Sequence, residues 1–258
     1  MRILFIGDIV GQPGRKAVAR HLRRLVATNG VDAVIANAEN AAAGFGITPA
    51  VGQELFDQGI ALLTSGNHVW DRKEAEAYLA KEGRILRPAN YPDDVPGRGT
   101  HVLRVGERLV GVVNLQGRAF LPPIDCPFRA ADRELAELAR VSDIIIVDFH
   151  AEATAEKQAF GWYVDGRVSA VVGTHTHVQT ADERILPGRT AYITDVGMTG
   201  PRDSVIGIRQ QDAIPKFLTQ MPRRFAVADG PTQLSAVLVD VEESGRASAI
   251  RRLQIVDD

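Results

Sequence analysis

The sequence RILFIGD, residues 2–8, is a short apolar run that ends at a carboxylate, and the rest of the chain repeats this pattern. Four later apolar runs also end at side chains able to bind a metal ion. The residues at the five ends are Asp8, Glu39 with Asn40, Asn67 with His68, His150, and His175 with His177. In α/β folds, the loops beyond the carboxyl ends of strands gather in one crevice. We therefore expect these residues to meet in a single metal site.

Strands and helices are predicted to alternate in the first half of the chain, as they do in parallel βα units. A strand at 3–7 precedes an amphipathic helix at 15–27, and a second strand follows at 33–36. The other elements expected in this half are a helix from Pro49 through Asp57 capped by Thr48, a strand at 60–64, a helix at 72–81 and a loop at 87–99.

The second half of the chain adds hairpins to this pattern. Strands at 101–105 and 109–113 flank a short turn, and strands at 234–241 and 247–255 form a second hairpin. Between them we expect helices at 130–140 and 155–160 and strands at 144–147, 170–172 and 191–194. Residues 119–128 and 198–230 receive no assignment. The pattern predicts one α/β domain over residues 1–258, with mixed sheets and helices outside.

Composition limits the partners and the location of the protein. The net charge of −2 and the pI near 6.3 give no basic footprint for duplex nucleic acid. The single cysteine, Cys126, excludes an internal disulfide and a thiolate metal cluster. The first apolar run meets Asp8 too soon for a signal-peptide core, and no run approaches the roughly 18 residues of a membrane span. We expect a cytoplasmic protein without a membrane partner.

The candidate ligands are two carboxylates, two amide oxygens and three imidazoles, once His68 is set aside. Such hard or borderline donors suit manganese, iron, cobalt or zinc. They are too many for one ion that keeps an open position. Two ions about 3.5–4 Å apart, bridged by a carboxylate and a hydroxide, would use them all. Glu39 is the natural bridging carboxylate.

The charge of this site predicts an anionic substrate. Two divalent ions against the carboxylates of Asp8 and Glu39 leave a surplus of about two positive charges, which a phosphate ester can offset. Metal-activated water would supply the nucleophile, and the leaving oxygen would still need a proton. His68 suits that role, because it stands beside Asn67 without having to bind metal, and imidazoles titrate near neutral pH.

Four motifs together resemble those of the calcineurin-like metallophosphoesterases. They are Gly7-Asp8, Gly66-Asn67-His68, the later His150, and Gly-Thr-His-Thr-His at 173–177. Within that superfamily, the segments at 7–11, 37–40 and 65–68 are similar to the bacterial YmdB-type branch, described as phosphodiesterases of 2′,3′-cyclic nucleotides. The resemblance covers most of the chain. It implies a four-layer α/β/β/α sandwich with two mixed sheets and two transition-metal ions, iron or manganese.

Two departures from the general superfamily pattern also point to the YmdB-type branch. Val10 stands where Asp-x-His would place a histidine, and Glu39 followed by Asn40 replaces the usual bridging aspartate. The resemblance implies the following ligands: Asp8, Glu39, Asn40 and His177 at one ion, and Glu39, Asn67, His150 and His175 at the other. It also implies that His68 is the general acid.

Several alternatives stay open at this level. The same metal core would serve a phosphomonoesterase or a nuclease, and a regulatory protein could bind a phosphate ligand without turnover. Candidate substrate contacts are Arg118, Arg202, Arg209, Asn90 and Thr199, all in or beside loop-like stretches. The long unassigned segments offer surface for a homo-oligomer.

Overall fold

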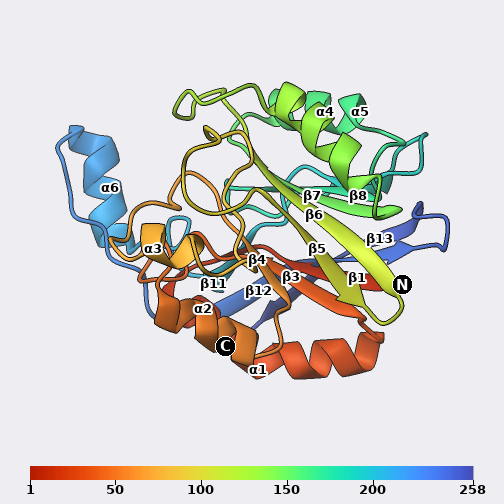
Figure 1. The fold of residues 1–258 in the computed structure, drawn as a ribbon. Helices are drawn as coiled ribbons and strands as arrows, with labels where there is room; N and C mark the ends of the chain where they lie inside the picture. Colours follow the sequence, from red (N-terminus) through yellow and green to blue (C-terminus); the bar gives the residue numbers. More distant parts are fainter. Residues whose placement is uncertain (258) are drawn as a thin grey trace.

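The computed structural model describes residues 1–257, in which two β-sheets pack face to face between outer helices (Figure 1). The first sheet comprises β1 (Arg2–Ile6), β2 (Asp8–Ile9), β3 (Ala33–Asn37), β4 (Leu62–Thr64), β11 (Met198–Pro201), β12 (Thr232–Val241) and β13 (Ala247–Val256). Its strand order is β2-β11-β12-β1-β3-β4, with β13 also paired to β12. β1, β3 and β4 run parallel, whereas β12 is antiparallel to β1. This sheet is therefore mixed.

The second sheet follows the order β5-β6-β7-β8-β10-β9. Its strands are β5 (Thr100–Val105), β6 (Arg108–Gln116), β7 (Ile144–His150), β8 (Ala170–Thr174), β9 (Arg184–Ile185) and β10 (Ala191–Ile193). β6, β7, β8 and β10 are parallel, and antiparallel β5 and β9 lie at the edges. The carboxyl ends of β7 and β8 consequently lie side by side, which places His150 next to Thr174 in the register.

The helices form the two outer layers. α1 (Gly11–Asn29) and α2 (Pro49–Asp57) lie on one side of the paired sheets, and α4 (Pro127–Leu138) and α5 (Thr154–Tyr163) lie on the other (Figure 1). The short α3 (Ala75–Leu79) lies near α2, and α6 (Gln210–Thr219) projects from the body of the molecule. Thr48 caps α2, because its Oγ1 accepts a hydrogen bond from the amide of Val51 at 3.4 Å.

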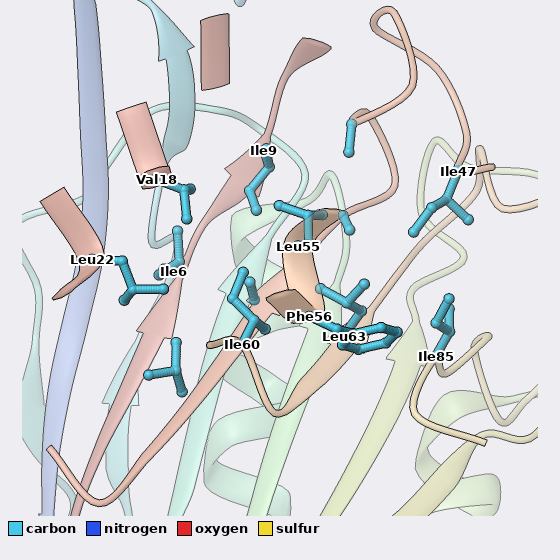
Figure 2. Close-up of a cluster of buried hydrophobic side chains, with 14 of the residues drawn as sticks. Ile6, Ile9, Val18, Leu22, Ile47, Leu55, Phe56, Ile60, Leu63 and Ile85 are labelled. Carbon is cyan, nitrogen blue, oxygen red and sulfur yellow. The ribbon is translucent and has the colours of Figure 1, made fainter. Parts of the chain in front are cut away.

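Alternation along the strands divides the core into three layers. In β1, Leu4 and Ile6 face α1, whereas Ile3 and Phe5 face the second sheet. Figure 2 shows the outer layer on the first sheet, where Ile6 meets Val18 from α1. The other outer layer lies between the second sheet and α4 and α5. Three apolar layers separate four layers of structure, which confirms the expected α/β/β/α sandwich.

Both expected hairpins are present as β5–β6 and β12–β13, and β12 pairs with β1 as well. The helix expected at 72–81 is shorter than predicted: residues 71–74 form bends and turns, in which the Arg72 side chain donates to the carbonyl oxygen of Phe45, and α3 begins at Ala75. The unassigned stretch 198–230 contains β11 and α6. Within residues 1–257, none of the helices combines the length and the apolar composition needed to cross a membrane.

Candidate metal centre

The predicted ligands do converge, and they come from both sheets. Asp8 begins β2, Glu39 and Asn40 follow β3, and Asn67 follows β4. His150 ends β7, while His175 and His177 follow β8. All of these positions lie at or just beyond the carboxyl ends of strands, and Asp8 does so as well, because it follows β1 after Gly7. The gathering of strand carboxyl ends in one crevice therefore accounts for the whole cluster.

One group of potential ligand atoms surrounds His150. Its Nε2 lies 3.1 Å from Glu39 Oε1, 3.1 Å from Asn67 Oδ1 and 3.1 Å from His175 Nδ1. Glu39, His150 and His175 each offer a ligand atom within 4.8 Å of the others. His150 and Glu39 are buried and His175 is half-buried. This group can hold a metal ion.

A second group surrounds Asp8 and shares Glu39 with the first. Asp8, Glu39 and His177 again offer ligand atoms within 4.8 Å of one another. His177 Nε2 lies 4.0 Å from Asp8 Oδ1 and 3.3 Å from Asn40 Oδ1. The Nδ1 atom of His177 lies 2.8 Å from the carbonyl oxygen of Ile206, which fixes the ring. Glu39 is thus common to both groups, as a bridging ligand must be.

The charges of neighbouring residues in the cluster shift one another's pKa values. Burial opposes the ionisation of Glu39, but the charge of His150 and its hydrogen bond outweigh it and lower the pKa of Glu39 to about 2. Burial likewise opposes a charge on His150, but Glu39 and Asp8 raise its pKa to about 9. Burial and the neighbouring His150 lower the pKa of His175 to about 3. The buried carboxylates thus favour a cation at their centre.

Three observations fit this cluster to metal ions. Asp8 Oδ1 is buried without a hydrogen-bond partner, although a buried carboxylate oxygen normally has one. A Cβ atom on Gly66 would lie 2.1 Å from the His150 ring and 2.5 Å from Glu39 Oε2, so glycine keeps this space open. The donors are imidazoles, carboxylates and amide oxygens, which suit divalent transition metals. The residues of this cluster therefore fit bound metal ions.

A buried hydrogen-bond network holds the His150 ring through its Nδ1 atom. Thr174 Oγ1 donates to Asp148 Oδ1 at 2.7 Å and therefore accepts from Nδ1 of His150 at 2.9 Å. Asp148 also accepts hydrogen bonds from Thr64 and from Asn37, at 2.5 Å and 3.0 Å. Nδ1 of His150 thus carries the proton, which leaves Nε2 turned toward Glu39. This network was not predicted from the sequence; the polar Asp148 inside an apolar strand was the available signal.

His68 lies at the edge of the cluster. Its backbone amide donates to Glu39 Oε2 at 3.1 Å, and its Nδ1 lies 2.8 Å from Asp71 Oδ2. The Phe45 ring packs edge-on against the imidazole with 5.0 Å between centroids. The side chain of His68 is about one-third exposed, at 30%. These contacts fix the ring beside the candidate ligands while leaving it within reach of solvent.

A small cleft opens beside the cluster. Its lining combines ligand candidates with an apolar wall: Val10, Glu39, Asn40, Gly44, Phe45, His68, His175, His177, Ile206, Ile208 and Phe225. None of the five predicted substrate contacts is among these lining residues.

Three of those five contacts have local partners instead. Asn90 holds the amide and the carbonyl oxygen of Gln116, Thr199 donates to the carbonyl oxygen of Ser235, and Arg209 pairs with Asp229. The backbone amides of Arg118 and Arg202 bond to Glu156 and to the Pro231 carbonyl oxygen.

The family model described as YmdB-like protein matches residues 4–253 of this chain. The chain belongs to the YmdB-like family. It is 50% identical to the 2′,3′-cyclic-nucleotide 2′-phosphodiesterase of Bacillus subtilis strain 168, over 100% of this chain and 98% of that protein. The resemblance inferred from the motifs is therefore confirmed, and the chain is a hydrolase of the metallophosphoesterase type.

Solved structures agree with this YmdB-like assignment. A hypothetical protein from Thermus thermophilus superimposes with a TM-score of 0.95 at 44% identity, with 100% of both chains covered. A phosphatase from Mycoplasma pneumoniae superimposes with a TM-score of 0.94 at 34% identity, covering 100% of this chain and 94% of that one. This YmdB-like chain therefore shares the fold of its relatives throughout its length.

Proposed function

We propose that this YmdB-like protein is a dinuclear metal-dependent phosphodiesterase, with iron or manganese at the two groups of ligands described above. The observation that carries the proposal is the position of Glu39, which offers carboxylate oxygens to both groups. Asp8, Asn40 and His177 would complete one ion's shell, and Asn67, His150 and His175 the other's. Bound ions supply Lewis acidity and activate water for attack on phosphorus.

The proposed substrate is a small cyclic phosphodiester such as 2′,3′-cyclic AMP. The curated relative from Bacillus subtilis bears the name of a 2′,3′-cyclic-nucleotide 2′-phosphodiesterase and matches this chain from end to end. The charge of the site supports an anion, since two divalent ions outweigh the carboxylates of Asp8 and Glu39 by about two charges. The small cleft, with its apolar wall of Phe45, Ile206 and Phe225, is consistent with a small ligand rather than a duplex.

In the proposed reaction, water attacks phosphorus and the bond from phosphorus to the 2′ oxygen breaks. The 2′ oxygen then needs a proton, and His68 donates it from Nε2. Asp71 Oδ2 lies 2.8 Å from Nδ1 of His68, which fixes the orientation of the ring. The backbone amide of His68 donates to Glu39 Oε2, and this hydrogen bond fixes the proposed general acid beside the proposed metal ligands. The product retains its phosphate on the 3′ oxygen.

The test is hydrolysis of 2′,3′-cyclic AMP by protein loaded with manganese or iron. We expect His68→Ala to lower kcat by about 10²–10⁴-fold, the usual contribution of a general acid, while metal content stays unchanged. Glu39→Gln is expected to lower metal content as well as turnover. Glu107→Gln, an exposed change in the turn between β5 and β6, is the matched control. Full turnover by Glu39→Gln would disprove the dinuclear proposal.

The same assay separates the alternative activities. A phosphomonoester, a cyclic diester and single-stranded RNA are supplied at equal concentration to the loaded protein. Preference for the monoester indicates a phosphomonoesterase and preference for RNA indicates a nuclease. Tight binding of the cyclic nucleotide without turnover indicates a regulatory protein.

A homo-oligomer in the cytoplasm completes the proposal. Apolar side chains on and beside α6 are exposed, among them Ile214, Phe217, Leu218 and Met221, and such patches often mediate association. Light scattering of the purified protein tests this part. The cytoplasmic location rests on the single cysteine, Cys126.

A further inference from the structure

Two candidate ligands have backbone conformations that side chains rarely adopt. His175 has φ of 102° and His177 has φ of 66°, both in the left-handed region that favours glycine. Such residues persist only where the surrounding structure holds them, and they concentrate at functional sites. Some contact must therefore fix the backbone around these two histidines.

A buried ion pair lies directly against this segment. Lys157 of α5 places its Nζ 2.6 Å from Asp195 Oδ2, and both side chains are at most 1% exposed. Lys157 Nζ also donates to the carbonyl oxygen of Thr174 at 2.7 Å. Asp195 Oδ2 in turn accepts a hydrogen bond from the amide of Thr176 at 3.1 Å. The pair thus bonds to the backbone on both sides of His175.

Asp195 also connects this segment to the chain that follows β10. Its Oδ1 accepts the amide of Gly197 at 2.8 Å, and its carbonyl oxygen accepts the amide of Thr180 at 3.0 Å. Two backbone hydrogen bonds join the same segments, from Val196 to the Gly173 carbonyl oxygen and from Met198 to the His177 carbonyl oxygen. Hydrogen bonds therefore hold the segment that contains both histidines at its start, at its centre and at its end.

We propose that Lys157 and Asp195 are positioning residues that hold His175 and His177 in the conformation needed for metal binding. The inference rests on the proposed metal site. A buried ion pair contributes little net stability compared with a well-packed apolar pair, so its stabilising effect alone gives no reason for it. Its hydrogen bonds to Thr174 and Thr176 give that reason, since an apolar pair could not make them.

The test replaces the pair by apolar residues of similar size, in the variant Lys157→Met/Asp195→Leu. This double change avoids leaving one buried charge uncompensated, which either single change would do. Two measurements are made, each well below the unfolding temperature. One is the manganese Kd by calorimetry, and the other is amide hydrogen exchange of residues 173–178 in metal-free protein.

We expect the variant to bind manganese at least tenfold more weakly, within the roughly 10–100-fold range for residues that orient metal ligands. We also expect faster exchange of the Thr176 amide, which loses its acceptor. The control removes a different, partly exposed ion pair, Arg252 with Glu183, through Arg252→Met/Glu183→Leu. It is expected to leave both measurements unchanged. Wild-type affinity and wild-type exchange in the Lys157→Met/Asp195→Leu variant would overturn the inference.

If the proposed function were wrong, the experiments would give a different set of results. Wild-type protein that binds no manganese or iron would remove the metal site itself, whereas the exchange rate of Thr176 in metal-free protein would still decide whether the pair holds the segment. Equal losses of affinity in the control and in the Lys157→Met/Asp195→Leu variant would also overturn the inference, because the effect would then be general destabilisation.

Discussion

Gly66 leaves no room for a side chain at the centre of the candidate site. A Cβ added there would lie 2.1 Å from Cδ2 of His150 and 2.5 Å from Glu39 Oε2, whereas ordinary contacts begin near 3.4 Å. Both neighbours are buried, so neither can swing away into solvent. Gly66→Ala must therefore displace the imidazole, the carboxylate or the loop itself by about 1 Å.

This displacement determines the size of the expected effect. A misplacement of about 1 Å in a catalytic arrangement can cost about 10²-fold in rate. We expect Gly66→Ala to lower kcat/KM for 2′,3′-cyclic AMP by at least that factor and to weaken manganese binding. The cost in unfolding free energy should be about 1–3 kcal/mol, as for other overpacked interiors. The folded state should therefore survive while the site fails.

The assay combines steady-state kinetics, calorimetric metal binding and thermal unfolding. Gly83→Ala is the matched control, because a Cβ at that position meets nothing within 4 Å. We expect the control to retain wild-type activity and metal affinity. Should Gly66→Ala bind two ions and turn over within about threefold of wild type, less than the loss expected for a misplaced ligand, the geometry derived for the site would be wrong.

Four further predictions concern the hydrogen-bond network, the proton on His150 (two of them) and the fold. Thr174→Val, which removes the acceptor of the Nδ1 proton of His150, should weaken manganese binding about 10-fold or more by calorimetry, and Thr174→Ser should restore it. Because the pKa of His150 is raised to about 9, metal must displace a proton below that pH. Affinity should therefore improve by up to about tenfold per pH unit as pH rises toward about 9. The same raised pKa stabilises the metal-free protein below about pH 6.5, and this stability should be lost in thermal unfolding as pH rises through about 9. Finally, Thr48→Ala should cost about 1 kcal/mol in denaturant unfolding, because α2 loses its cap.

The positions of the ligand candidates could be predicted because they depend on a local rule. Each apolar strand ends at a polar residue, and the topology of an α/β fold gathers those ends, so His150 and Glu39 meet although they are far apart in sequence. The four layers were predicted from the family resemblance, and alternation in β1, where Ile3 and Leu4 face opposite sides, shows how the sequence forms them.

The residues that hold the ligands could not be predicted by that rule. Asp195 and Lys157 are ordinary charged residues in the sequence, and only the packing of α5 on the second sheet buries them together. α6 was missed for another reason. Pro215 lies inside this helix, and a proline within a stretch normally predicts a helix boundary, so residues 210–219 received no assignment.

The site joins two sheets, and its geometry depends on how those sheets are fixed together. Asn37 and Thr64 belong to the first sheet, Thr174 belongs to the second, and all three donate to the buried carboxylate of Asp148. That carboxylate is linked to His150 through Thr174, whereas Glu39, which lies beside His150, follows a strand of the first sheet. Apolar packing between the sheets is not directional, so it cannot set the separation of the two groups to a fraction of an ångström. Hydrogen bonds to one shared carboxylate can, because each has a narrow range of length and angle. Asp148 therefore links the two sheets at the point where they must jointly hold the ions.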